Sequence, residues 1–174
     1  MRCAQSGDRM AYSALVGRYW QPVHGWLAGL CWDDHLAEDL TQEAFVQAWA
    51  SLPRLAAPAA FRVWLFRIAR NVWLATRRSP SPLAGAAHPE IPGSGPGPDI
   101  EAVEREGDGA LLLAIARLPD SYREAYLLWT QERLPYTALA EILGTTEETA
   151  RWRVCEARRR LVIELRPFLD ALEP

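Results

Sequence analysis

A group of arginines near the C-terminus has the clearest chemistry in this sequence. Five arginines lie between positions 151 and 160. The chain has no lysine, so all of its Lys and Arg positions are arginines. A guanidinium group binds phosphate oxygens in bidentate fashion and also stacks on bases and aromatic rings. A genome rich in G and C also favours Arg codons, so composition alone decides nothing. At helical spacing, however, one exposed face of this segment would carry Arg151, Trp152, Cys155, Arg158 and Arg159.

The residues that usually carry catalysis or bind metals are few and scattered. Cys3, Cys31 and Cys155 are far apart, lack C-x-x-C spacing, and are not joined by the three His residues into a metal-binding set. We therefore expect no enzyme activity, no metal and no cofactor. No apolar run is long enough to span a membrane and the N-terminus lacks a secretory signal pattern, so we expect a cytoplasmic protein without membrane insertion.

The arginines belong to a segment, 135–161, that predicts two helices joined by a tight turn. Gly144 breaks the first helix, because glycine readily adopts the left-handed backbone that ends helices. Thr145 and Glu148 then have the spacing of a capping box. The second helix has a narrow apolar stripe at Ala150, Val154, Ala157 and Leu161. This layout is typical of a DNA-binding helix-turn-helix, although a helical hairpin with a solvated arginine face has similar spacing.

The rest of the chain also predicts helices and no sheet, since no stretch alternates with a period of two. Helices are expected over 11–31, from Asp33 or Asp34 to Ala50, and from Ala59 to Arg78. After them comes a stretch rich in Pro, Gly, Ser and acidic residues, which disfavours regular structure. We therefore predict an all-α fold of two small helical domains, each with its own small core, at 1–78 and 109–174, with a flexible, acidic linker at 79–108.

Net charge follows this division. Residues 1–78 carry nine Arg against six acidic residues, whereas residues 79–110 carry one Arg against six. The whole chain has a net charge of −3 and a pI of about 5.7. This balance argues against a nonspecific nucleic-acid coat but leaves room for local basic faces.

Both helical blocks resemble one known family. The stretch LPDSYREAYLLW at 118–129, together with the end of the 135–161 segment, resembles region 4 of extracytoplasmic-function (ECF) sigma factors, the small members of the sigma-70 family. AEDLTQEAFVQAW at 37–49 and FRVWLFRIARN at 61–71 resemble their region 2. The resemblance implies a sigma factor that binds core RNA polymerase and directs promoter recognition and DNA melting at initiation. It also implies control by an anti-sigma factor that covers both DNA-binding domains.

The resemblance assigns roles to three groups of residues. Asp39, Gln42 and Glu43 share one helix face. In the family, the matching positions contact the polymerase. Melted −10 DNA would be held by Arg62, Trp64, Arg67, Asn71, Arg77 and Arg78, through phosphate contacts and base stacking or base-edge hydrogen bonds. Trp64 is equally well explained as a core residue, and the acidic face as a solvated surface. The −35 duplex would be contacted by Thr149, Arg151, Trp152, Arg153, Cys155, Arg158 and Arg159.

Four positions depart from the family pattern. Ala75 and Ala138 stand where acidic residues are usual, and Trp152 and Glu156 stand where a small polar residue and an Arg are usual. An acid repels phosphate and Trp is bulky in a groove, so we expect −35 recognition to rely on Arg151, Arg158 and Arg159.

Two other functions remain open from the sequence. One is a helix-turn-helix regulator that binds DNA without polymerase, which would not need the face formed by Asp39, Gln42 and Glu43. The other is a helical enzyme or adaptor, for which no catalytic constellation is present.

Overall fold

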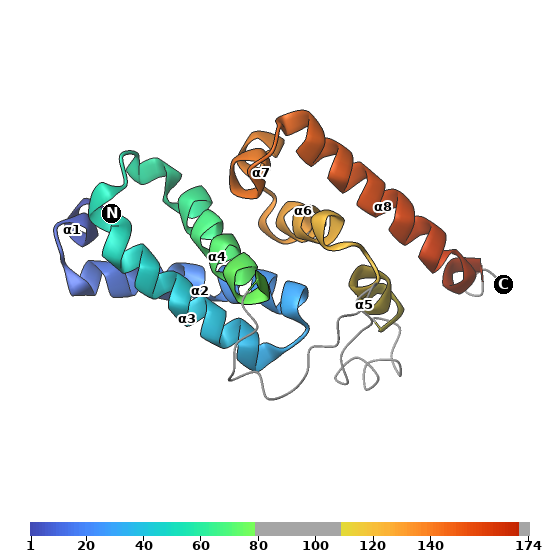
Figure 1. Cartoon of the computed structure of the whole chain (residues 1–174), viewed down its shortest axis with the longest axis horizontal. Helices are drawn as coiled ribbons and strands as arrows, with labels where there is room; N and C mark the ends of the chain where they lie inside the picture. The colour runs from blue at the N-terminus through green and yellow to red at the C-terminus, as the bar shows by residue number, and fades with distance from the viewer. Residues whose placement is uncertain (79–108, 171–174) are drawn as a thin grey trace.

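The computed structural model describes residues 1–78 and 109–170, and in these two ranges it contains helices and no strand (Figure 1). The predicted all-α class is confirmed. The N-terminal part has α1 (Arg2–Gln5), α2 (Arg9–Cys31), α3 (Asp34–Ser51) and α4 (Phe61–Arg78). The C-terminal part has α5 (Gly109–Ala116), α6 (Asp120–Glu132), α7 (Tyr136–Leu143) and α8 (Glu147–Asp170). The predicted linker at 79–108 lies outside the described residues.

Aspartates set where α2 and α3 begin. The Asp8 carboxylate accepts hydrogen bonds from the first-turn amides of α2, and Asp33 accepts one from the Leu36 amide at 3.0 Å. These bonds satisfy amides that have no partner inside the helix. Asp33 is therefore the cap of α3. Between α2 and α3, Trp32 adopts a left-handed backbone with φ of 55°, which turns the chain back sharply.

The structure differs from the predicted boundaries at two places in the N-terminal part. The short helix α1 was not predicted, because four residues are too few to show helical periodicity. The helix expected from Ala59 begins at Phe61 instead, after the two short 3₁₀ turns Leu52–Arg54 and Pro58–Ala60. Each turn has a proline in its first positions, where a missing amide hydrogen costs nothing.

Helices α2, α3 and α4 pack on one another around large buried side chains. Trp26 and Phe66 are fully buried and meet edge to face, with ring centroids 5.6 Å apart. Thr41 is also fully buried, and its hydroxyl donates to the carbonyl of Ala37 at 2.6 Å. The hydroxyl thus finds a partner inside its own helix, as a buried polar group must.

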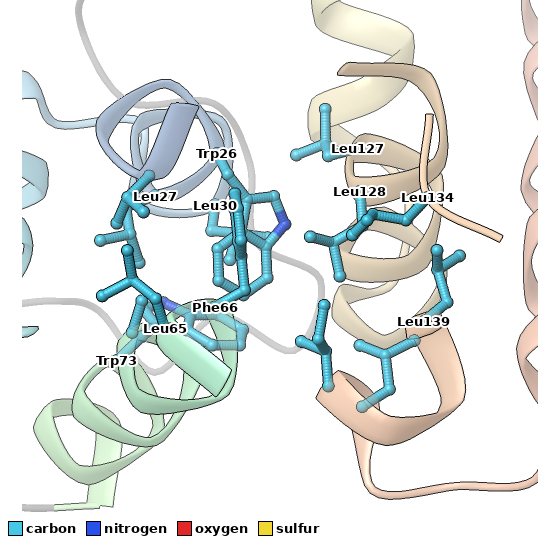
Figure 2. Close-up of a cluster of buried hydrophobic side chains, with 14 of the residues drawn as sticks. Trp26, Leu27, Leu30, Leu65, Phe66, Trp73, Leu127, Leu128, Leu134 and Leu139 are labelled. Carbon is cyan, nitrogen blue, oxygen red and sulfur yellow. The ribbon is translucent and has the colours of Figure 1, made fainter. Parts of the chain in front are cut away.

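The buried side chains of the two parts form one continuous cluster, and the expectation of two separate cores is wrong. Figure 2 shows Trp26, Leu30 and Phe66 on one side of this cluster and Leu127 and Leu128 of α6 on the other. Apolar side chains of α2 and α6 that would otherwise face water cover each other instead. Small helical domains bury little surface alone, so a shared cluster adds to their stability.

Two features that residues 1–78 and 109–170 lack bear on function. None of their helices combines the length and apolarity needed to cross a membrane. Within the same ranges, no group of three or more His, Cys, Asp or Glu side chains is arranged to hold a metal ion.

Candidate nucleic-acid interface

Helices α7 and α8 form a helix-turn-helix whose turn is closed by backbone hydrogen bonds. Gly144 ends α7 with φ of 60°, and the amide of Thr145 donates to the carbonyl of Ala140 at 3.0 Å. Thr146 caps α8, since its hydroxyl accepts from the Thr149 amide at 3.1 Å. The predicted capping box at Thr145 and Glu148 is therefore wrong by one residue. The reason is that the amide of Thr145 still closes the end of α7, one residue after the left-handed Gly144.

The buried stripe of α8 is the predicted one. Ala150, Val154, Ala157 and Leu161 are between 0% and 4% exposed and pack toward the rest of the C-terminal part. Since successive residues turn by about 100° around a helix, this stripe leaves a broad outer face. The exposed residues on this face include Arg151, Trp152, Cys155, Arg158 and Arg159. Five of the seven residues predicted for −35 DNA therefore lie at the surface together.

Aromatic rings support the guanidinium groups along this surface. Arg151 lies 4.8 Å from the centroid of the Tyr136 ring of α7 and donates to Glu147 at 2.8 Å. Arg158 lies 5.3 Å from the ring centroid of Trp129 of α6. Rings beneath a guanidinium restrict it while leaving its N–H groups free to bind an acceptor. The rings come from other helices, so sequence spacing within α8 could not reveal them.

Trp152 is held at the surface instead of being buried. Its side chain is 55% exposed, and its ring meets that of Tyr122 edge to face at 5.6 Å. The guanidinium of Arg160 lies 4.7 Å from the centroid of the same tyrosine ring. A large aromatic surface therefore lies beside the exposed arginines of α8.

Glu156 is bound to two arginines on its own helix. Arg159 donates to it at 2.8 and 2.7 Å, and Arg160 donates at 2.8 Å. These hydrogen bonds lower the pKa of Glu156 to about 2, so the carboxylate stays charged at every ordinary pH. The i, i+3 and i, i+4 spacing could have indicated both pairs from the sequence.

The other two residues predicted for −35 DNA lie apart from this face. Thr149 is half-buried, and its hydroxyl lies 2.8 Å from that of Thr146 in the capping turn. Arg153 is half-buried on the flank of α8, where its charge acts on Glu124 of α6. The structure therefore does not bring these two residues together with the exposed five.

The residues predicted for −10 DNA divide into two groups on α4. Asn71 and Arg78 are exposed, and Trp64 is half-buried with its ring 5.8 Å from that of Phe61. The remaining three arginines instead pair with carboxylates of the C-terminal part. These pairs are Arg62 with Glu132, Arg67 with Glu141, and Arg77 with Asp120.

A fourth pair of this kind was missed in the sequence. Arg70 donates through Nε to Glu124 at 2.6 Å, with side chains only 18% and 5% exposed. Burial raises the pKa of Glu124, although the hydrogen bond from Arg70 opposes that effect. The two residues are 54 positions apart, so no local pattern could have indicated the contact.

The residues predicted to contact polymerase share one exposed face of α3. Asp39, Gln42 and Glu43 are all exposed, and Glu43 accepts a hydrogen bond from Gln47 at 2.8 Å. Val46 completes the face at the next helical turn and is 63% exposed. Single exposed apolar residues are common on protein surfaces, so Val46 alone does not distinguish a protein-docking surface from a solvated one. Val46 follows Asp39 by seven residues, or two helical turns, so the sequence alone could have placed it on the same face.

Two protein-family models match the chain. The model described as Sigma-70 region 2 matches residues 15–81, and the model described as Sigma-70, region 4 matches residues 108–161. Curated relatives are similar over nearly the whole chain. RNA polymerase sigma-H factor of Pseudomonas aeruginosa is 31% identical over 95% of this chain and 91% of its own length. ECF RNA polymerase sigma-E factor of Haemophilus influenzae is 30% identical over 95% of this chain and 93% of its own length.

A further relative is longer. The probable RNA polymerase sigma factor RfaY of Xanthomonas campestris is 32% identical over 96% of this chain, which spans 43% of that protein's length. Two solved structures share the fold. CnrH in complex with the cytosolic domain of CnrY has a TM-score of 0.69 at 22% identity, covering 98% of this chain and 94% of that one. RpoE of Bartonella quintana in complex with the anti-sigma factor NepR has a TM-score of 0.71 at 23% identity, covering 90% and 97%.

The order of the two matched regions and the full-length similarity agree with the helix-turn-helix, the basic α4 and the exposed face of α3. The chain belongs to the ECF sigma factors of the sigma-70 family. This membership supports transcription initiation with RNA polymerase over the alternative of a regulator that binds DNA alone.

Proposed function

We propose that this chain docks on core RNA polymerase through α3 and reads promoter DNA through α8 and α4. The proposed domains are residues 1–78 and 109–174, joined by 79–108. In this proposal α8 binds the −35 element as duplex, and α4 holds the −10 element after melting. The protein contributes no catalytic chemistry of its own, and it acts in the cytoplasm, where RNA polymerase meets the chromosome.

The observation that carries the proposal is the outer face of α8. It combines a capped helix start, exposed arginines and a buried stripe that fixes which side faces outward. A helix of this kind fits the major groove, which is wide enough to admit it. Arg151 and Arg158 are held over aromatic rings, so little side-chain freedom is lost when they bind phosphates or guanine edges.

Docking on polymerase is proposed for the face of α3 that contains Asp39, Gln42, Glu43 and Val46. Carboxylates around an exposed apolar residue match a partner that is basic and partly apolar. Charge steers such an encounter, and the apolar contact adds affinity once the surfaces meet. Val46 is therefore added to the three residues expected from the sequence.

Control by a separate protein is also part of the proposal. Both solved structures of similar fold contain a second protein, and the one bound to RpoE, NepR, is an anti-sigma factor. We propose that an anti-sigma factor binds this chain as well.

Run-off transcription with purified core polymerase and genomic promoter fragments tests the proposal. Transcripts that depend on added protein are expected, and they should be lost in the double variant Asp39→Arg, Glu43→Arg because its charge no longer suits the partner. Asp34→Arg reverses one charge, half the change of the double variant, at the exposed start of α3 and serves as the control for added positive charge. Failure of the unaltered protein to bind core polymerase at low salt would contradict the proposal.

A further inference from the structure

Four arginines of α4 each pair with a carboxylate of the C-terminal part, one of which, Asp120, is shared with the buried Arg123 of α6. Their partners on α6 and α7 are Asp120, Glu124, Glu132 and Glu141. Arg62 donates in addition to the backbone carbonyl of Glu132 at 2.6 Å. The carboxylates therefore form an acidic row along the basic side of α4. Figure 1 shows α6 and α7, the helices that carry them, on one side of α4.

The Arg70–Glu124 pair at the centre of this contact is buried, whereas the Arg67–Glu141 pair is open to water. Glu124 is 5% and Arg70 is 18% exposed, whereas the Arg67 and Glu141 side chains are 46% and 51% exposed. Exposed ion pairs contribute little free energy and are screened by salt. The buried Arg70–Glu124 pair therefore contributes most to the specific docking of α4 on the C-terminal part. Charge complementarity along the row aligns the two parts.

An apolar contact lies beside the acidic row. Gly29 of α2 has no side chain, and a Cβ placed there would lie 2.8 Å from Cδ1 of Leu127 of α6. Leu127 is only 5% exposed, so its side chain has little room to move away. Gly25, one turn earlier on α2, would meet nothing within 4 Å. The close approach of α2 and α6 therefore depends on a glycine at position 29.

We infer that the acidic row is a binding surface for α4 that competes with DNA phosphates, so that the free protein closes on itself and masks its −10 helix. This inference rests on the proposed function. A carboxylate and a phosphate offer a guanidinium the same bidentate pair of oxygens. Arg62, Arg67 and Arg77 cannot hold both at once, so closure and −10 binding exclude each other.

Promoter geometry requires the closed form to open. The −35 and −10 elements are about 25 base pairs apart, which is about 85 Å at 3.4 Å per base pair. An ion pair of 2.6 Å between Arg70 and Glu124 cannot survive when α4 and α8 sit on the two elements. Thirty residues at 79–108 join the parts, and covalent geometry lets them span about 100 Å at most.

Closure masks one DNA-binding helix and leaves the other free. Figure 1 shows α8 along the side of the molecule away from α4. Among the described residues, the ion pairs made by the exposed arginines of α8 are all with carboxylates of α8 itself. A closed molecule can therefore still meet −35 duplex, and capture of the melted −10 strand is the gated step.

The contact has built-in costs that keep it reversible. The indole N–H of Trp26 is buried without an acceptor among the described residues, and in Figure 2 its nitrogen points toward α6. Burial also raises the pKa of Glu124, which means that removing this carboxylate from water costs free energy. Opening returns both groups to water and offsets part of the lost packing.

Gly29→Leu in the full chain tests the inference, because it wedges α2 from α6 without changing charge or any residue proposed to bind DNA. Gly25→Leu is the matched control. Cys31, near the end of α2, reports opening through its alkylation rate, measured by mass spectrometry against exposed Cys3 in the same molecule. We expect about tenfold faster alkylation of Cys31 in Gly29→Leu, as a loss of about 1.4 kcal/mol of docking energy gives. Small-angle scattering should show a larger radius of gyration.

Binding of a labelled oligo-dT strand measures the masking itself. Gly29→Leu should bind it about tenfold more tightly than the unaltered protein and Gly25→Leu, at the same salt concentration. By linkage, oligo-dT should speed alkylation of Cys31 in the unaltered protein. Should Gly29→Leu fold poorly by circular dichroism, Glu132→Arg gives a second route, with Glu164→Arg as the control of equal charge.

The outcomes separate this inference from the proposed function. Equal Cys31 alkylation and scattering in all variants would overturn closure in solution. An opened Gly29→Leu with unchanged oligo-dT affinity would overturn the masking. Neither result depends on run-off transcription, whose absence would instead contradict the proposed function.

Discussion

If α8 binds DNA as proposed, Glu156 competes with DNA phosphates for two arginines, and its removal gives a quantitative prediction. The carboxylate accepts hydrogen bonds from both Arg159 and Arg160, so the three side chains together carry a charge of +1. Glu156→Gln raises this charge to +2 and weakens the hold on both guanidinium groups. Lower pH cannot mimic the change, since the pKa of Glu156 is about 2.

The expected magnitude follows from counterion release. Each additional phosphate contact steepens the plot of log affinity against log salt by about 0.9 for duplex DNA. If one arginine is freed, a fourfold rise in salt should cost the variant about 3.5 times more affinity than it costs the unaltered protein. If both arginines are freed, the factor should be about 12. The variant should therefore bind more tightly at low salt, with the advantage shrinking as salt rises.

Fluorescence anisotropy with a promoter duplex from the run-off experiment, titrated at several salt concentrations, measures both slopes. Glu164→Gln is the matched control, because it makes the same charge change further along α8 at a carboxylate paired with Arg117. Parallel slopes for Glu156→Gln and the unaltered protein would refute the reasoning. They would mean that Arg159 and Arg160 do not reach phosphates.

Three further predictions concern stability and reactivity. Phe66→Ala should lower the free energy of unfolding by about 3–5 kcal/mol in denaturant titrations, since the ring is fully buried against Trp26. Thr146→Ala should cost about 1 kcal/mol and speed hydrogen exchange in the first turn of α8, which loses its cap. Burial raises the pKa of Cys31 to about 12, so its thiol is protonated at neutral pH. Its alkylation should be far slower than that of Cys3 and rise about tenfold per pH unit between roughly 7 and 9; a rate independent of pH would contradict the assigned pKa.

Helix positions were predictable because their signals are local. Asp33 and Gly144 mark helix ends through bonds to residues a few positions away. The one-residue error at Thr145 arose because two adjacent threonines offer the same capping chemistry. Which of them caps α8 depends on how many residues the left-handed turn after α7 uses.

The candidate site was predictable in part, and for the same reason. The outer face of α8 and the acidic face of α3 follow from the period of 3.6 residues, and so do the pairs that Glu156 makes. The rings of Tyr136 and Trp129 beneath arginines did not follow, because they lie on other helices.

The sequence by itself determined an all-helical chain with a basic helix in each part. The period of the apolar residues and the helix caps depend only on residues a few positions apart, so a local reading of the sequence finds them. Only the tertiary structure decided what those basic helices face. Arg70 and Glu124 are 54 residues apart, and Gly29 and Leu127 even further. Such contacts depend on how whole helices pack, so complementarity of shape and charge, which no local pattern records, turned α4 toward α6 and left α8 open.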